Sequence, residues 1–253
     1  MNPLHDPTAP WPYPRWIAHR GAGRLAPENT LAAMREGARH GYRAFECDVK
    51  LSADGVPFLL HDATLERTTD GTGDAGALGW AELSRLDAGG WLGRAWAGEP
   101  LASLAAVARF ALANGFAMNL EIKPSPGRER ETGELVAAQA ARLWAAGGTP
   151  PLLSSFRPEA LAGAQAGTPA LPRALLLEHP YEGWLALAQD LGCVAVVAHH
   201  GLIDAGFVAT LHAAGMKTLS YTVNDDALAR RLIGLGVEGL ITDAVDRFSP
   251  AAA

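Results

Sequence analysis

The feature that most constrains the fold of this 253-residue chain is a regular alternation of short apolar runs with longer segments of helical spacing. Several runs are continuously apolar, which is typical of parallel strands covered by helices. Strands are predicted at 16–19, 43–49, 117–122, 151–154, 173–177, 194–198, 217–223 and 238–242. Helices are predicted between them at 30–40, 101–114, 131–146, 158–166, 181–190, 204–214 and 226–234.

The spacing of these strands favours a closed barrel. Six of the seven intervals between strand starts are 34 residues or shorter, and only the interval from 43 to 117 is longer. Eight parallel strands joined by helices over ~250 residues are typical of a TIM (β/α)8 barrel. A doubly wound open sheet is the second possibility, although it usually has fewer strands. We therefore expect one α/β barrel domain over 15–249, preceded by an N-terminal arm at 1–14.

The long interval contains a turn and an insertion. Asp54-Gly55 between two apolar runs is a strong signal for a tight turn. We expect the chain to return antiparallel to the second strand, which places His61 opposite Cys47. The remainder, roughly 63–100, is expected to form a small inserted cap over the active site. Its Trp91 and Trp96 either line a ligand cavity or only pack the insertion.

Composition excludes several classes of protein. The formal net charge is −6 and no run of Lys or Arg exceeds two residues, so a nucleic-acid partner is not expected. No stretch reaches 18 uncharged apolar residues, so no membrane-spanning segment is expected. Two cysteines cannot form a disulfide framework, and the start has no secretory pattern. We expect a cytoplasmic protein whose oligomeric state stays open.

Charged side chains stand where the first three strands end. They are His19 and Arg20 after the first strand, Glu46 and Asp48 at the end of the second, and Glu121 and Lys123 at the end of the third. In a barrel these strand ends converge on one mouth. Three carboxylates that meet repel one another unless a cation lies between them, and oxygen ligands select a hard divalent ion, Mg²⁺ or Ca²⁺.

The other polar groups at this mouth suit a phosphate ester. His19 and His61 titrate near neutrality and can serve as general acid and base. Arg20 and Lys123 add fixed positive charge for a phosphate. Together with a metal, these groups predict phosphoryl-transfer chemistry. Which histidine is the acid and which the base stays open.

In order and spacing, the motifs resemble those of the glycerophosphodiester phosphodiesterase family of PLC-like TIM barrels. The motifs are Ile17–Ala22, Ala26–Thr30, Glu46–Val49, Asp54-Gly55, Leu60–Asp62, Leu65–Thr69, Glu121–Lys123, Ser154–Phe156, Tyr221–Asn224 and Gly239–Asp243. Each motif alone is weak evidence, but the ordered set covers about 15–249.

The resemblance implies hydrolysis of a small glycerophosphodiester to an alcohol and sn-glycerol 3-phosphate, with one divalent cation as cofactor. By position, the metal ligands would be Glu46, Asp48 and Glu121, the acid–base pair His19 and His61, and the phosphate contacts Arg20 and Lys123. Phe156 and Tyr221 stand at the ends of predicted strands and are candidates for the walls around the leaving alcohol. Tyr221 stands where the family commonly has Trp, so the alcohol is not specified.

Other interpretations stay open. A related phosphodiesterase or lyase could act on lysophospholipid or sphingolipid head groups, and a catalytically silent barrel could bind a phosphorylated ligand. Glu121 and Lys123 could form an ordinary ion pair. Asn29 is expected to be the N-cap of the helix that begins at Thr30. His199 and His200 are expected at the rim without a role.

Overall fold

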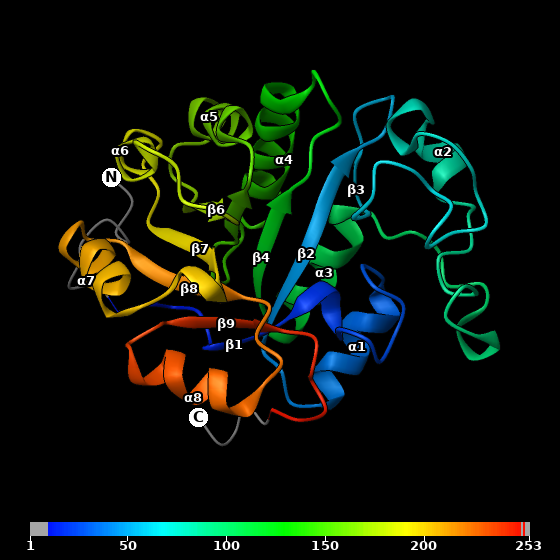
Figure 1. Ribbon diagram of the computed structural model, residues 1–253. Helices are drawn as coiled ribbons and strands as arrows, with labels where there is room; N and C mark the ends of the chain where they lie inside the picture. Colours follow the sequence, from blue (N-terminus) through cyan, green and yellow to red (C-terminus); the bar gives the residue numbers. More distant parts are fainter. Residues whose placement is uncertain (1–9, 249, 251–253) are drawn as a thin grey trace.

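The computed structural model describes residues 10–248 and Pro250, so positions 1–9 of the expected N-terminal arm and residue 249 lie outside the described residues. Eight parallel strands close into a barrel with helices outside (Figure 1). The strands are β1 Trp16–Ala18, β2 Ala44–Leu51, β4 Ala117–Ile122, β5 Leu152–Ser155, β6 Arg173–Leu177, β7 Ala195–His199, β8 Lys217–Tyr221 and β9 Gly239–Thr242. Each pairs with its neighbour, and β1 closes the barrel against β2 through Ala18 and Phe45. The predicted TIM barrel is confirmed.

The helices lie close to their predicted positions. They are α1 Leu31–Arg39, α3 Leu104–Asn114, α4 Glu129–Leu143, α5 Pro158–Gly167, α6 Trp184–Asp190, α7 Ala205–Ala213 and α8 Asp226–Gly234, with the short α2 Trp80–Leu83 in the insertion. Side-chain N-caps fix several starts: Ser103 accepts from Ala106, and Asp225 accepts from the backbone of Ala227 and Leu228. None of the described helices has the length and hydropathy that a bilayer span requires.

Two apolar layers hold the barrel together. Strands such as β2, β4 and β6 are buried along their whole length because helices cover one face and the barrel interior the other. Small and branched side chains, among them Ala174 and Val197, fill the interior at its amino-terminal end. Trp11 and Tyr13 pack against this layer, and the Tyr13 hydroxyl donates to the carbonyl of Pro150 at 2.8 Å. Polar side chains are thereby left to the opposite end.

A short strand, β3 (Pro57–Leu59), runs antiparallel to β2, with Val49 opposite Leu59 and Leu51 opposite Pro57. This is the register that a turn at Asp54-Gly55 produces. The ladder ends at Leu59, so His61 and Cys47 are not a ladder pair. The backbone of Leu60 still donates to the carbonyl of Asp48 at 3.1 Å, which carries His61 back toward the barrel mouth.

The insertion at 63–100 was expected to cover the barrel mouth, but it does not. It lies beside β3 and α3 (Figure 1), and its Leu65 and Leu83 form an apolar cluster together with Phe58 of β3. Trp91 is 41% exposed, and Trp96 packs against the main core. Because the segment buries its apolar residues against one another and against β3, it forms a flank rather than a lid.

Candidate active site

Strand alternation aims the acidic residues of two neighbouring strands into the barrel. On β2, Glu46 and Asp48 share the inner face, whereas Cys47 between them packs in the core outside the sheet. On β4, Glu121 faces inward and Leu120 joins the outer core. Asp48 lies directly opposite Glu121 in the β2–β4 ladder, so the register itself brings carboxylates together. The spacing of Glu46 and Asp48 in the sequence is enough by itself to predict that they share one face of the strand.

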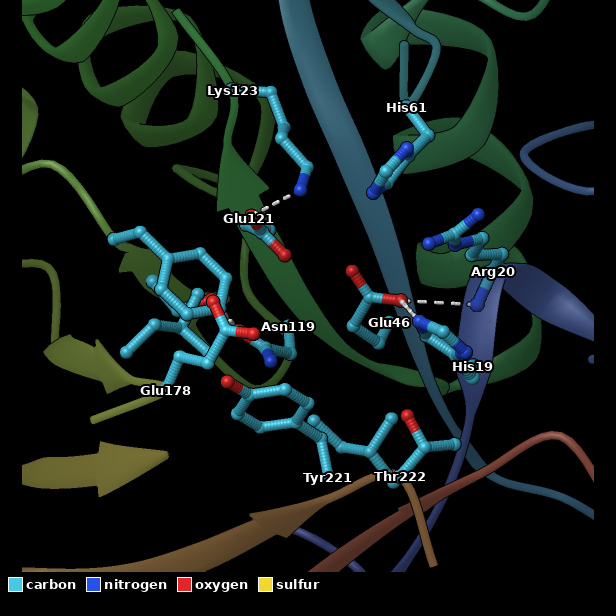
Figure 2. A pocket seen from close by; sticks show the side chains of 14 residues that line it. His19, Arg20, Glu46, His61, Asn119, Glu121, Lys123, Glu178, Tyr221 and Thr222 are labelled. Carbon is cyan, nitrogen blue, oxygen red and sulfur yellow. Dashed lines mark hydrogen bonds and ion pairs between the residues drawn. The ribbon is translucent and has the colours of Figure 1, made fainter. Parts of the chain in front are cut away.

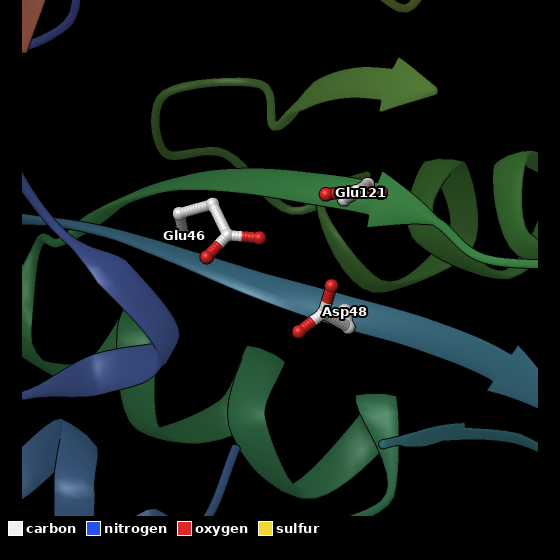
Figure 3. Close-up of side chains that lie close together, drawn as sticks. All are labelled: Glu46, Asp48 and Glu121. Atoms are coloured by element: carbon white, nitrogen blue, oxygen red, sulfur yellow. The ribbon is translucent and has the colours of Figure 1, made fainter. Parts of the chain in front are cut away.

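Glu46, Asp48 and Glu121 form a buried carboxylate cluster (Figure 3). One oxygen of each lies within 4.8 Å of the others. Burial, followed by the charge of Asp48, raises the pKa of Glu46 to about 8 and that of Glu121 to about 7. Burial also raises the pKa of Asp48, but the charges of Lys123 and Arg20 lower it by more than burial raises it. The net pKa of Asp48 is therefore below its usual value.

The cluster fits a hard divalent cation. Glu46 Oε1 is buried and has no hydrogen-bond partner among the described residues, which is costly unless another group binds it. Three convergent carboxylates are the donor set that Mg²⁺ and Ca²⁺ prefer. The same residues would therefore hold such an ion and be relieved of their mutual repulsion.

Asn29 holds one member of the cluster, and its expected role as an N-cap is wrong. Its side-chain amide donates to Asp48 Oδ2 at 2.8 Å, and its Oδ1 accepts from the backbone of Asp48 at 3.0 Å. The N-cap of α1 is Thr30, whose hydroxyl accepts from Ala33 at 3.1 Å. Asn29 has a φ of 61°, a left-handed conformation that Asn tolerates well and that turns the side chain toward the barrel.

His19 lies in the turn after β1, and a carboxylate orients its ring. Nδ1 is 2.6 Å from Asp243 Oδ1, and Nε2 is 3.8 Å from Glu46 Oε2. Asn224 in turn donates to Asp243 Oδ2 at 3.0 Å. Burial lowers the pKa of His19, but the hydrogen bond to Asp243 and the charge of Glu46 outweigh it, and the net pKa is raised. Asp243 and Asn224, both in the quoted family motifs, received no role from the sequence.

His61 has a similar partner on its Nδ1. That nitrogen is 2.7 Å from Asp62 Oδ1, the carboxylate of the next residue. Burial first, and Arg20 further, lower the pKa of His61 below its usual value, against the opposing effect of Asp48. With a carboxylate on Nδ1 the neutral ring is assigned the Nδ1–H tautomer, which leaves Nε2 free. Both imidazoles point into one cavity (Figure 2).

Two cations border the carboxylates. Lys123 Nζ is 2.8 Å from Glu121 Oε1 and 3.6 Å from Asp48 Oδ1, so the ion pair weighed as an alternative is formed, and it lies at the mouth. Arg20 Nη1 binds Glu28 at 2.8 Å, and its Nε is 3.5 Å from Asp48 Oδ2. Each cation is thus tied to the cluster while it faces the cavity, where an anionic substrate could join it.

The cavity at the carboxyl ends of the strands has a volume of about 490 Å³. It brings together eight of the nine predicted residues: His19, Arg20, Glu46, His61, Glu121, Lys123, Phe156 and Tyr221. Asp48 is the ninth and lies buried behind it. Phe156 and Tyr221 meet edge to face with centroids 5.8 Å apart. No residue of the insertion is among the cavity's described lining residues, so neither Trp91 nor Trp96 lines it.

Sequence reasoning missed several lining residues. Asn119 lies two positions before Glu121 on β4 and therefore shares its face, a signal that strand alternation contained. Glu178 directly follows β6 at the same end of the barrel. His199 ends β7 and meets Tyr221 edge to face, with ring centroids 5.9 Å apart, but it is not among the described residues that line the cavity.

Fold and site together define a class of protein. A buried carboxylate cluster, two carboxylate-oriented histidines and two cations at the mouth of a (β/α)8 barrel equip an enzyme for phosphate-ester chemistry. A family model described as the glycerophosphoryl diester phosphodiesterase family matches residues 19–247. The chain therefore belongs to this family, and the resemblance in its motifs is confirmed.

Individual relatives agree over nearly the whole chain. A phosphodiesterase from Oleispira antarctica, solved in complex with the product sn-glycerol-3-phosphate, is 34% identical with a TM-score of 0.86, covering 95% of this chain and 98% of that one. A glycerophosphodiester phosphodiesterase from Agrobacterium tumefaciens is 28% identical with a TM-score of 0.78, covering 95% and 100%. One from Caldanaerobacter subterraneus is 30% identical over 90% and 93% of the two chains.

Proposed function

We propose that this glycerophosphodiester phosphodiesterase hydrolyses its substrate to an alcohol and sn-glycerol 3-phosphate, with Glu46, Asp48 and Glu121 as ligands of one Mg²⁺ or Ca²⁺ ion. The observation that carries the proposal is a single cavity in which His19 and His61 flank this buried carboxylate cluster. The product bound in the Oleispira antarctica phosphodiesterase supports the same choice of substrate class.

The histidines supply the proton transfers. The bond from phosphorus to the alcohol oxygen breaks, and a bond from phosphorus to the attacking oxygen forms. One imidazole Nε2 accepts the proton of the attacking group, and the protonated Nε2 of the other gives a proton to the leaving alkoxide. Asp243 and Asp62 support this division of roles. Each carboxylate is paired with the Nδ1 atom of one imidazole, so the Nε2 atom of that ring is left to face the cavity.

The remaining groups bind and orient the diester. A divalent ion, when bound, supplies positive charge that stabilises the charge developing on the phosphoryl oxygens. Arg20 and Lys123 contribute fixed charge to the same phosphate. Phe156 and Tyr221 offer apolar walls for the organic part of the substrate.

Release of sn-glycerol 3-phosphate from glycerophosphocholine and glycerophosphoethanolamine tests this proposal. We expect release in Mg²⁺ or Ca²⁺, loss of release in EDTA and recovery when the metal is restored in excess. Undiminished release in EDTA would exclude the metal, and turnover of lysophospholipids alone would exclude the substrate class.

A further inference from the structure

Arg67, in the motif Leu65–Thr69, lies where the insertion meets the barrel. Arg67 Nε lies 2.6 Å from Asp62 Oδ2 and Nη2 lies 3.1 Å from Asp62 Oδ1. On its other edge, Nη1 lies 2.7 Å from Glu28 Oε2 and Nη2 lies 2.8 Å from Glu28 Oε1. One guanidinium therefore engages both oxygens of two carboxylates, a geometry that lysine cannot reproduce.

The two carboxylates lead to two active-site residues. Asp62 Oδ1 is 2.7 Å from His61 Nδ1, and Glu28 Oε1 accepts from Arg20 Nη1 at 2.8 Å. The result is an alternating series of charged groups from Arg20 through Glu28, Arg67 and Asp62 to His61. The hydrogen bonds of Arg67 also hold the pKa of Asp62 well below its usual range, so Asp62 stays an acceptor for the imidazole.

The segment that carries Arg67 is anchored. Leu65 is fully buried in the apolar cluster of the insertion, and its carbonyl accepts from both the backbone and the hydroxyl of Thr69, at 3.1 and 2.7 Å. An exposed ion pair is usually weak because two mobile side chains must be ordered. Here the turn is fixed and both pairings use two oxygens, which are the conditions under which such a pair orients its partner.

We propose that Arg67 is a positioning residue for the reaction, which acts through Asp62 to hold the His61 imidazole toward the scissile phosphate. The inserted segment then contributes to catalysis from the side of the barrel, although it lines no part of the cavity. The inference rests on the proposed function for its kinetic consequence, but the ring orientation itself can be measured without turnover.

The kinetic test compares Arg67→Gln, Asp62→Asn and the double variant on glycerophosphocholine at saturating metal. We expect kcat to fall about 10- to 100-fold in each single variant, with KM changed less than about threefold. The double variant should lose no more than the worse single variant, because both changes break one series of contacts. Arg67→Lys should recover only part of kcat.

Arg130→Gln is the matched control, since Arg130 makes a pair with Glu134 on the exposed face of α4. It should retain wild-type kcat. The proposal is overturned by an Arg67→Gln kcat within about twofold of wild type, by losses that multiply in the double variant, or by a rise in KM alone. A rise in KM alone would instead place the effect on Arg20 and phosphate binding.

Nitrogen-15 NMR of labelled histidine separates this inference from the proposed function. The His61 ring signals are assigned by their loss in His61→Ala. We expect the Nδ1–H tautomer in the wild-type protein and a mixed tautomer in Arg67→Gln, whether or not any diester is turned over. An unchanged tautomer in a folded Arg67→Gln protein would contradict the positioning role.

Discussion

His19 and His61 reach the same cavity from chain segments 42 positions apart. The Nδ1 atom of each ring lies within hydrogen-bond distance of a carboxylate. Asp243 holds the first ring and Asp62 the second, so the two Nε2 atoms are directed by separate parts of the chain. Neither imidazole can replace the other, because each ring is held by its own carboxylate.

His19→Ala and His61→Ala should therefore each lower kcat by about 10²- to 10⁴-fold, the range for loss of a general acid or base. The initial rate on glycerophosphocholine measures this, with circular dichroism to establish that the fold is intact. His212→Ala, which removes a 40%-exposed imidazole on α7, is the matched control and should be as active as wild type. A near-wild-type rate in either active-site variant would remove that histidine from the mechanism.

The helices and strands show where sequence patterns succeed. A period of two along β2 and β4 predicts that Glu46, Asp48 and Glu121 share the inner face, and the ladder then brings them together. Asp243 was missed as the partner of His19 because it lies 224 positions away, and only barrel closure brings β9 beside β1. The place of the insertion was missed for a similar reason: its packing against Phe58 of β3, a contact that the sequence does not display, decides it.

Helix starts give a test with a defined pH dependence. Hydrogen bonds from Leu228 and Ala227 at the start of α8 lower the pKa of Asp225 below its unfolded value. A depressed folded pKa means that the charged cap stabilises the protein above the unfolded pKa, and that this contribution is lost as pH falls through the folded pKa.

Asp225→Ala should therefore lower the urea midpoint at neutral pH, and the difference from wild type should shrink between about pH 5 and pH 3. Asp190→Ala, at the end of α6 where its carboxylate caps no helix start, serves as the control. A difference that stays constant over this range would mean that the charge of Asp225 does not contribute.

Three buried carboxylates converge in the mouth of the barrel, and their mutual repulsion strains the folded protein. A ligand that binds only the folded state stabilises it, by about 2.7 kcal/mol at 100 times its Kd. Mg²⁺ or Ca²⁺ should therefore raise the Tm in a concentration-dependent manner, and EDTA should reverse the shift.

Glu121→Gln should weaken this response, since it removes one charged ligand, whereas Glu134→Gln on the outer face of α4 should keep it. Differential scanning calorimetry of the three proteins with and without metal measures the effect. The same metal response in Glu121→Gln and wild type would exclude the cluster as the binding site.

The measurement that tests the central claim most directly is a phosphorus-31 NMR time course of glycerophosphocholine with the wild-type protein in Mg²⁺ or Ca²⁺. We predict that the diester resonance is replaced by that of sn-glycerol 3-phosphate, because the proposed reaction breaks the bond from phosphorus to the choline oxygen. Accumulation of phosphocholine, or a diester signal that never declines in the presence of either metal, would contradict it.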